Sequence, residues 1–287
     1  MVYLGESVSF CEGELIATGG KNILLGTSGW SYKEWEGNFY RKNEKRKLCA
    51  YSAVFKTAEI DSSFYRIPSK GTAMGWLRYS PSDFVFTAKM PKSITHEKQL
   101  GLKGDFSKDL EAFTEVMRPL QLAGKLACLL IQLPPKYEFN PENLERFLKQ
   151  LDPVFNYAVE FRNLSWLRDE TWSILKEQGV AYVNVDEPLL PPEVHLTSDF
   201  AYFRWHGKGK TPWFDYRYSN EEIDEWVPRV QSAALKVKKI VGYFNNHFHG
   251  YAPENCLYLI EKLGLLTEEQ KIVKNAASKQ LKLGEFT

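Results

Sequence analysis

The sequence predicts an α/β fold, a single TIM-barrel-like (β/α)8 domain with parallel strands. The chain has 287 residues, 44% of them hydrophobic and 25% charged, and one closed barrel commonly has this size. Short apolar runs alternate with helical patterns almost throughout the chain. No run is followed by GxGxxG or GxxxxGKS/T, the phosphate-binding signatures of nucleotide-binding open sheets. The closed barrel is therefore favoured over a doubly wound sheet.

The expected strands are short and nearly continuous in apolar residues, as in parallel strands that are covered on both faces. They are expected at 23–28, 57–61, 84–89, 127–133, 157–162, 180–187, 200–207 and 239–246. Helices are expected near 44–55, 69–80, 107–122, 141–151, 166–178, 219–236 and 252–263. The connection from Glu187 to Ser198 is proline-rich and is expected to be irregular.

Several of these helices have recognisable ends. Helix starts are expected at Ser69, Ser107, Asn140 and Ser219. Pro141 occupies the first helical position after Asn140, and Glu222 completes a capping box with Ser219. Gly179 stands where a helix should end before the sixth strand.

One domain accounts for most of the chain, because no low-complexity linker divides it. Residues 1–22 precede the first strand and are expected to form an N-terminal extension. Residues 23–265 are expected to form the barrel. Residues 266–287 are rich in Lys and Glu and are expected to form a C-terminal helical tail.

Composition limits the classes of partner. The formal net charge is +1, so no global field attracts nucleic acid or a membrane surface. Four widely spaced cysteines form no CxxC pair and no zinc-type spacing, which indicates reduced thiols. The first residues lack the pattern of a signal peptide, and no apolar run has the length of a membrane span. We therefore expect a cytoplasmic protein without a membrane partner.

Polar residues share one face of several expected strands, because side chains two apart point the same way. The pairs are Glu59 with Asp61, Thr87 with Lys89, Glu160 with Arg162, Asn184 with Asp186, and Arg204 with His206, while Gln132 and Asn245 add one each. The opposite parity is apolar, as at Val159 and Phe161 or at Val183 and Val185. We expect the polar set to face the barrel lumen near the C-terminal strand ends, where barrel enzymes place their active sites. An interior salt-bridge network without function is the alternative.

Long motifs carry a family resemblance. They are GTSGWSYKEW (26–35), AEIDSSFYRIPS (58–69), FTAKMPKSITH (86–96), LLIQLPP (129–135), VEFRNLSW (159–166), YFRWHG (202–207), YSNEEIDEW (218–226) and YFNNHFHGYAPENC (243–256). In this order they resemble the family called domain of unknown function 72, or YecE-like proteins, from about Ile23 to Leu259. The resemblance implies a TIM-barrel-like fold and brings no established reaction. Asp61 departs from a common asparagine, and Asn163-Leu164 from a usual His-Pro.

Three residues are assigned to catalysis. Glu160 is the candidate acid/base group if desolvation raises its pKa. Because a flanking arginine favours the carboxylate form, Glu160 is expected to act as a base or ligand rather than as a proton donor. Lys89 is a cationic contact for an anionic substrate or, alternatively, a Schiff-base amine. Asp186 is assigned with them and, like Glu59, is expected to orient the cations. A static ion pair of Glu160 with its neighbours is the competing interpretation.

The remaining site residues are assigned to substrate binding. They are Glu59, Gln132, Arg162, Arg204, His206, Asn245, Asn246, Tyr65 and Trp30. Arginines suit bidentate recognition of phosphate or carboxylate, so the excess of cations indicates an anionic ligand. The alternative is that the cations neutralise the neighbouring acids one for one.

No motif requires a cofactor, and no residue is assigned to a metal. A divalent metal stays an alternative, because Glu59, Glu160, Asp186, His206, His247 and His96 offer oxygen and nitrogen ligands. Zinc-dependent apurinic-site endonuclease barrels use similar combinations, an analogy of fold alone. Cations in the same layer would repel a dication.

Three functions from different classes follow. The first is an enzyme using acid/base chemistry on a small phosphorylated or carboxylated substrate at the C-terminal mouth, as a hydrolase, lyase or isomerase. The second is a non-catalytic module that binds nucleic acid or a phosphorylated ligand, with aromatics stacking a short or single strand. The third is a metal-dependent phosphoesterase or endonuclease. The oligomeric state stays open.

Overall fold

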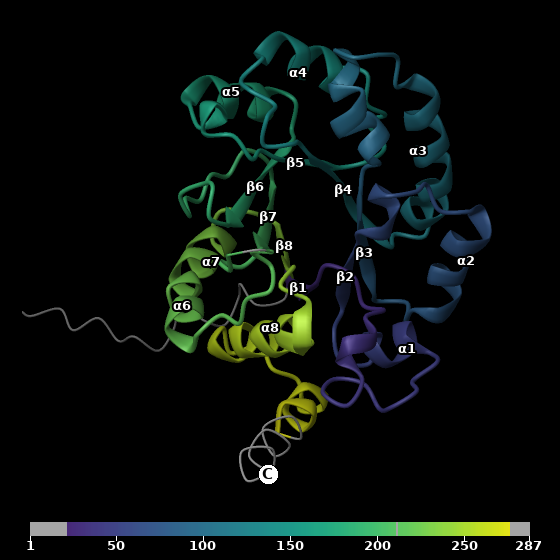
Figure 1. Cartoon of the computed structure of the whole chain (residues 1–287), viewed down its shortest axis with the longest axis vertical. Helices are drawn as coiled ribbons and strands as arrows, with labels where there is room; N and C mark the ends of the chain where they lie inside the picture. The colour runs from purple at the N-terminus through teal and green to yellow at the C-terminus, as the bar shows by residue number, and fades with distance from the viewer. Residues whose placement is uncertain (1–21, 211, 276–287) are drawn as a thin grey trace, which may run out of the picture.

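The computed structural model describes residues 22–210 and 212–275, and in them eight parallel strands form a nearly closed barrel (Figure 1). The strands are β1 (Ile23–Thr27), β2 (Thr57–Ile60), β3 (Val85–Lys89), β4 (Leu126–Gln132), β5 (Tyr157–Glu160), β6 (Ala181–Asp186), β7 (Phe200–Trp205) and β8 (Lys239–Phe244). Each strand lies beside its sequence neighbour, and β8 pairs with β1. The predicted barrel is confirmed. The expected extension over residues 1–22 lies almost wholly outside the described residues.

Helices surround the strands as an outer layer (Figure 1). They are α1 (Lys47–Ser52), α2 (Lys70–Tyr79), α3 (Ser107–Leu122), α4 (Pro141–Leu148), α5 (Asp169–Glu177), α6 (Asn220–Asp224), α7 (Trp226–Ala234) and α8 (Tyr251–Lys262). Within the described residues β6 and β7 are joined without a helix, and residues 268–275 are helical. No described helix is long and apolar enough to cross a membrane.

Most predicted helix ends are confirmed. Ser69 and Asn140 accept hydrogen bonds from backbone N–H groups three residues later, and Ser219 and Glu222 form the capping box. The start of α3 differs, because its N-cap is Phe106 rather than Ser107. The Asp105 carboxylate accepts hydrogen bonds from both the backbone N–H and the hydroxyl of Ser107.

A tyrosine joins β1 to β2, which form only one isolated bridge, between Ser28 and Glu59. The Tyr51 hydroxyl, from α1, accepts a hydrogen bond from the Thr27 N–H at 2.8 Å. The same hydroxyl donates to the Thr57 carbonyl at 3.1 Å. One fully buried side chain thereby satisfies backbone groups that a regular ladder would pair.

The core has two layers. The outer layer lies between strands and helices and includes Val159, Phe161 and Trp205. The inner layer fills the barrel lumen and includes Leu130, Ala158, Val183, Val185, Tyr202, Val241 and Tyr243. The polar cluster described below lies past this inner layer, at the C-terminal ends of the strands.

The predicted parity of β6 is wrong. Val183 and Val185 pack in the lumen layer, so Asn184 and Asp186 point to the outside of the barrel. Oδ1 of Asn184 accepts from the backbone N–H of His195, and Asp186 accepts from Nε1 of Trp226 in α7 at 2.8 Å. The cause is that this strand is polar on its outer face, where an irregular connection and an indole N–H supply partners. A polar residue in a parallel strand therefore did not mark the lumen.

Candidate functional site

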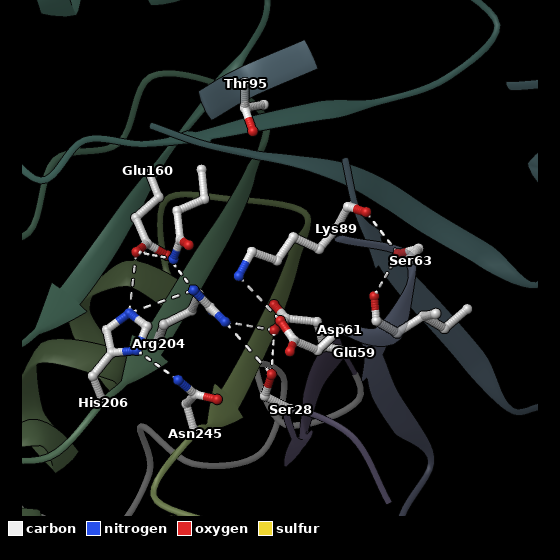
Figure 2. Close-up of polar contacts among 12 residues, drawn as sticks. Ser28, Glu59, Asp61, Ser63, Lys89, Thr95, Glu160, Arg204, His206 and Asn245 are labelled. Atoms are coloured by element: carbon white, nitrogen blue, oxygen red, sulfur yellow. Dashed lines mark hydrogen bonds and ion pairs between the residues drawn. The ribbon is translucent and has the colours of Figure 1, made fainter. Parts of the chain in front are cut away.

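Side chains from most strands meet at the C-terminal mouth of the barrel (Figure 2). Glu59, Lys89, Gln132, Glu160 and Arg204 come from β2, β3, β4, β5 and β7. Ser28, Asp61, Glu187, His206 and Asn245 follow directly after strands, and Arg162 lies two residues past the end of β5. Most of these side chains are buried, and we call this set the mouth cluster. The structure therefore brings together most of the predicted site residues.

Arg204 occupies the centre of the mouth cluster, between two carboxylates (Figure 2). Its Nη1 lies 2.5 Å from Oε2 of Glu160, and its Nη2 lies 2.6 Å from Oε1 of Glu59. Glu59 also accepts from the Ser28 hydroxyl at 2.5 Å and from the Tyr202 hydroxyl. Burial lowers the pKa of Arg204, but the two carboxylates outweigh it and hold the pKa well above the usual value. This cation is therefore permanently charged, and both of its Nη atoms are paired with carboxylates.

Glu160 is surrounded by donors. Its Oε1 accepts from Gln132 Nε2 at 2.6 Å and from Arg162 Nε at 2.9 Å, and Oε2 accepts from Arg204. Burial alone would raise the pKa of Glu160, but the Arg204 guanidinium, His206 and Arg162 hold it well below the usual range. Glu160 is thus an ionised anchor that orients its neighbours.

His206 is a neutral, fully buried member of the cluster. Burial lowers its pKa to about 3; the Glu160 carboxylate opposes this change, and the guanidinium groups of Arg204 and Arg162 act in the same direction as burial. The Asn245 amide nitrogen lies 3.0 Å from Nδ1 (Figure 2), and Nε2 lies 3.2 Å from Oε1 of Glu160. His206 therefore stays uncharged across the physiological range.

Arg162 lies at the opening and contacts a carboxylate that the sequence prediction missed. Its Nη2 is 3.3 Å from Oε2 of Glu187, and its guanidinium lies 5.3 Å from the Trp213 ring centroid. Glu187 is only 4% exposed, and neither of its oxygens has a partner in hydrogen-bonding geometry among the described residues. Burial raises the pKa of Glu187 to about 7, although Arg162 opposes the change. The sequence VNVDE (183–187) could have indicated this position, because Glu187 shares the parity of Val183 and Val185, which face the lumen.

Lys89 forms the other cationic corner of the mouth. Its ammonium lies 3.1 Å from Oδ1 of Asp61 and 4.0 Å from the Phe64 ring centroid. Burial lowers the pKa of Lys89, and Asp61 opposes this. His96, from the π-helical turn Ser93–Glu97, is half-buried nearby, and burial followed by the charges of Lys89 and Arg162 lowers its pKa to about 4.

Four predicted site residues stand apart from the mouth cluster. Asp186 bonds Trp226 and lies 3.4 Å from the Lys208 ammonium on the outer side, so its expected lumen position is wrong. The Asn246 amide donates to the Tyr216 carbonyl and to Asn255. The other two are aromatic: Trp30 packs against Trp76 and Phe86, and Tyr65 is 70% exposed beside Phe64.

One group of potential metal ligands occurs among the described residues. Oxygen or nitrogen atoms of Glu160, Glu187 and His206 lie within 4.8 Å of one another. The guanidinium of Arg162 lies among these atoms, with Nη2 3.2 Å from His206 Nε2 and 3.3 Å from the Glu187 oxygen. It already supplies the positive charge that a metal would bring, so the three residues do not fit a dication while Arg162 holds this position.

Comparisons with known proteins agree on the fold. The family described as "Protein of unknown function DUF72" matches residues 24–281. A DUF72 family protein of Thermotoga maritima has a crystal structure that is similar with a TM-score of 0.76 at 34% identity, covering 85% of this chain and 99% of that chain. The UPF0759 protein YunF of Bacillus subtilis is 27% identical over 271 residues, 85% of this chain and 95% of its own length. An AP endonuclease of family 2 from Brucella melitensis is similar in fold alone, with a TM-score of 0.50 at 12% identity, covering 80% of this chain and 96% of that one.

Proposed function

This chain belongs to the DUF72 family, which brings no reaction with it, and from the site we propose an enzyme that performs acid/base chemistry on a small anionic substrate. The substrate carries a phosphate or a carboxylate and binds at the C-terminal mouth of the barrel. Lys89 and Arg162 bind the anionic group, while Arg204 and Glu160 hold the surrounding side chains in place.

The observation that carries this proposal is the unused donor capacity of Lys89 and Arg162. An ammonium has three N–H donors, yet Asp61 is the one hydrogen-bond acceptor of Lys89 among the described residues. Arg162 uses Nε and Nη2 on the mouth cluster, and its Nη1 has no acceptor there. The two side chains are 9% and 13% exposed, so both reach the opening. An anion between them would complete both donor sets.

Neutral groups beside these cations support the same substrate class. His96 feels the charges of both Lys89 and Arg162, and its low pKa leaves it as an uncharged hydrogen-bonding group. Asn245 adds an uncharged amide at the same opening. Cations with neutral donors around them suit a single phosphate or carboxylate better than a long polyanion, which requires a continuous basic groove.

An enzyme is favoured over a passive binding module by the cost of the buried charges. Arg204, Glu59 and Glu160 lose their hydration in the lumen, which costs several kcal/mol per ion before pairing offsets it. A binding site could use exposed cations without this cost. A fixed, water-poor polar layer with perturbed pKa values is typical of sites that perform chemistry.

Binding of inorganic phosphate and of citrate, measured by calorimetry, tests the anion site. We expect Lys89→Met and Arg162→Met each to weaken binding by about tenfold or more. Lys92→Met is the matched control, because this lysine follows the same strand, is 47% exposed and pairs with Glu97. Equal losses in all three variants, or no binding by the unmodified protein, would contradict the proposal.

Chemistry is tested by incubating the protein in D2O with phosphorylated and carboxylated small molecules and following C–H exchange and product formation by proton NMR. Exchange or turnover that is lost in Arg162→Met supports the enzyme. Oligonucleotide binding that falls steeply with salt, without any product, would support the non-catalytic module instead. Turnover that requires an added divalent metal would favour a metal-dependent phosphoesterase.

A further inference from the structure

We infer that Glu187 is the group that exchanges a proton with the bound substrate, in place of Glu160. This inference rests on the proposed function and names the acid/base residue and the kind of substrate that it serves. The substrate is an anion whose exchangeable C–H or O–H lies next to its phosphate or carboxylate.

The hydrogen-bond partners of the mouth carboxylates distinguish Glu187 from the others. Glu59 accepts from Ser28, Tyr202 and Arg204, and Glu160 accepts from Gln132 and two arginines. Asp61 accepts from Lys89. Both oxygens of Glu187 lack any such partner among the described residues, although the side chain is fully buried. A buried acceptor without a donor is costly, so its presence indicates a functional demand.

The surroundings of Glu187 hold it between the charged and the neutral form. Burial favours the neutral acid, and the negative charge of Glu160 acts in the same direction. Arg162 and Arg204 favour the carboxylate, and neutral His206 and Tyr182 complete the charged or titratable groups around it. A group with a pKa of about 7 accepts and returns protons efficiently near neutral pH. Glu160, which is permanently ionised, is a much poorer proton donor.

Arg162 connects the proton-transfer group to the anion site. Its Nη2 contacts Glu187, while its Nη1 is one of the unused donors at the opening. A phosphate or carboxylate bound at Nη1 and the Glu187 carboxylate at Nη2 would therefore be held by the same guanidinium group. A proton on the atom next to that anionic group would then come within reach of the Glu187 oxygens.

The proposed step balances without a further reagent. A Glu187 oxygen takes the proton from the substrate carbon or oxygen, and the bond's electron pair stays on the substrate. The negative charge that develops is stabilised by Arg162 and Lys89. Glu187, now a neutral carboxylic acid, returns the proton to the same or a neighbouring atom, as in an isomerisation or an exchange.

Titration of the intact protein tests this inference without knowledge of the substrate. With glutamate labelled by ¹³C at the side-chain carboxyl, NMR follows each carboxyl from about pH 5 to about pH 9, and Glu187→Gln identifies the Glu187 signal. We expect Glu187 to titrate near pH 7 and Glu160 to stay ionised throughout. Inorganic phosphate should raise the Glu187 midpoint, because the anion draws on the charge of Arg162. A Glu187 midpoint below pH 5 would overturn the inference.

Turnover and binding separate this inference from the proposed function. In the D2O experiment Glu187→Gln should slow exchange about a hundredfold or more while phosphate affinity is kept. Phosphate binding that depends on Lys89 and Arg162, with full exchange in Glu187→Gln, would sink the inference and leave the anion site standing. Normal titration of Glu187 near neutrality without any phosphate binding would instead remove the proposed function.

Discussion

Nη1 of Arg204 lies 2.5 Å from Oε2 of Glu160, and neither side chain has any exposed surface. The same guanidinium neutralises Glu59 through Nη2. Arg204→Met would leave two buried carboxylates without this cation, so we expect a loss of about 3–5 kcal/mol in the free energy of unfolding. Urea denaturation at neutral pH measures the loss.

Arg118→Met is the matched control for this change. Arg118 pairs with Asp152 at 3.0 Å, but its side chain is 39% exposed, so the expected loss is at most about 1 kcal/mol. Similar losses in the two variants would show that burial does not determine how much the Arg204 ion pairs contribute to the free energy of unfolding.

Asp186 is expected to matter for stability and not for the anion site. Asp186→Ala removes the acceptor of the buried Trp226 Nε1–H, which should cost about 1–3 kcal/mol in unfolding free energy. Phosphate affinity should stay within about twofold of the unmodified protein, because Asp186 faces α7 and Lys208. Calorimetric phosphate binding beside urea denaturation measures both effects. A loss of phosphate affinity without a loss of stability would show that Asp186 belongs to the anion site.

The same strand shows how far the sequence could predict the site. All eight strands and the lumen positions of Glu59, Lys89, Glu160 and Arg204 followed from apolar runs and from alternation. On β6 the rule failed because both faces are buried and each can hold polar residues when partners exist. Alternation fixes which residues share a face, but not which face points inward. Because Val183 and Val185 point inward, Glu187, which has the same parity, also points inward.

The sequence also could not predict which side chains of the mouth cluster pair with one another, for a different reason. Glu160 and Glu187 are the same residue type and lie at or just past strand ends. Glu160 accepts hydrogen bonds from several donors, whereas Glu187 only lies near the Arg162 guanidinium, at 3.3 Å from Nη2. Their pKa values move in opposite directions as a result. That difference arises from contacts between β4, β5 and β7, which lie far apart in the chain, so a one-dimensional pattern does not contain it.

Tyr51→Phe tests how the barrel closes between β1 and β2. The change removes one hydroxyl and leaves the buried Thr27 N–H without its acceptor, so we expect a loss of about 1–3 kcal/mol in unfolding free energy. Tyr258→Phe is the control, since the Tyr258 hydroxyl forms an exposed bond to Asp224 and should cost less than about 0.5 kcal/mol. Equal costs, measured by urea denaturation, would mean that water replaces Tyr51 at the seam.

Glu187 also predicts a pH dependence of stability with a definite sign. Its pKa is about 7 in the folded protein and 4.5 as a free group, so the folded state binds more protons between these values. The stabilisation is complete below about pH 4.5 and is lost as the pH rises through about 7. The shift corresponds to about 3 kcal/mol.

Comparison with Glu187→Gln isolates this contribution. His206 acts in the opposite direction, because its lowered pKa makes stability fall as the pH falls below its usual range, but it is present in both proteins. The unfolding free energy of the unmodified protein minus that of Glu187→Gln should therefore decrease by about 3 kcal/mol between about pH 4.5 and about pH 8. A constant difference across this range, in urea denaturation at several pH values, would mean that the pKa of Glu187 is the same in the folded and the unfolded protein. Glu187 would then be ionised near neutrality and could not return a proton there.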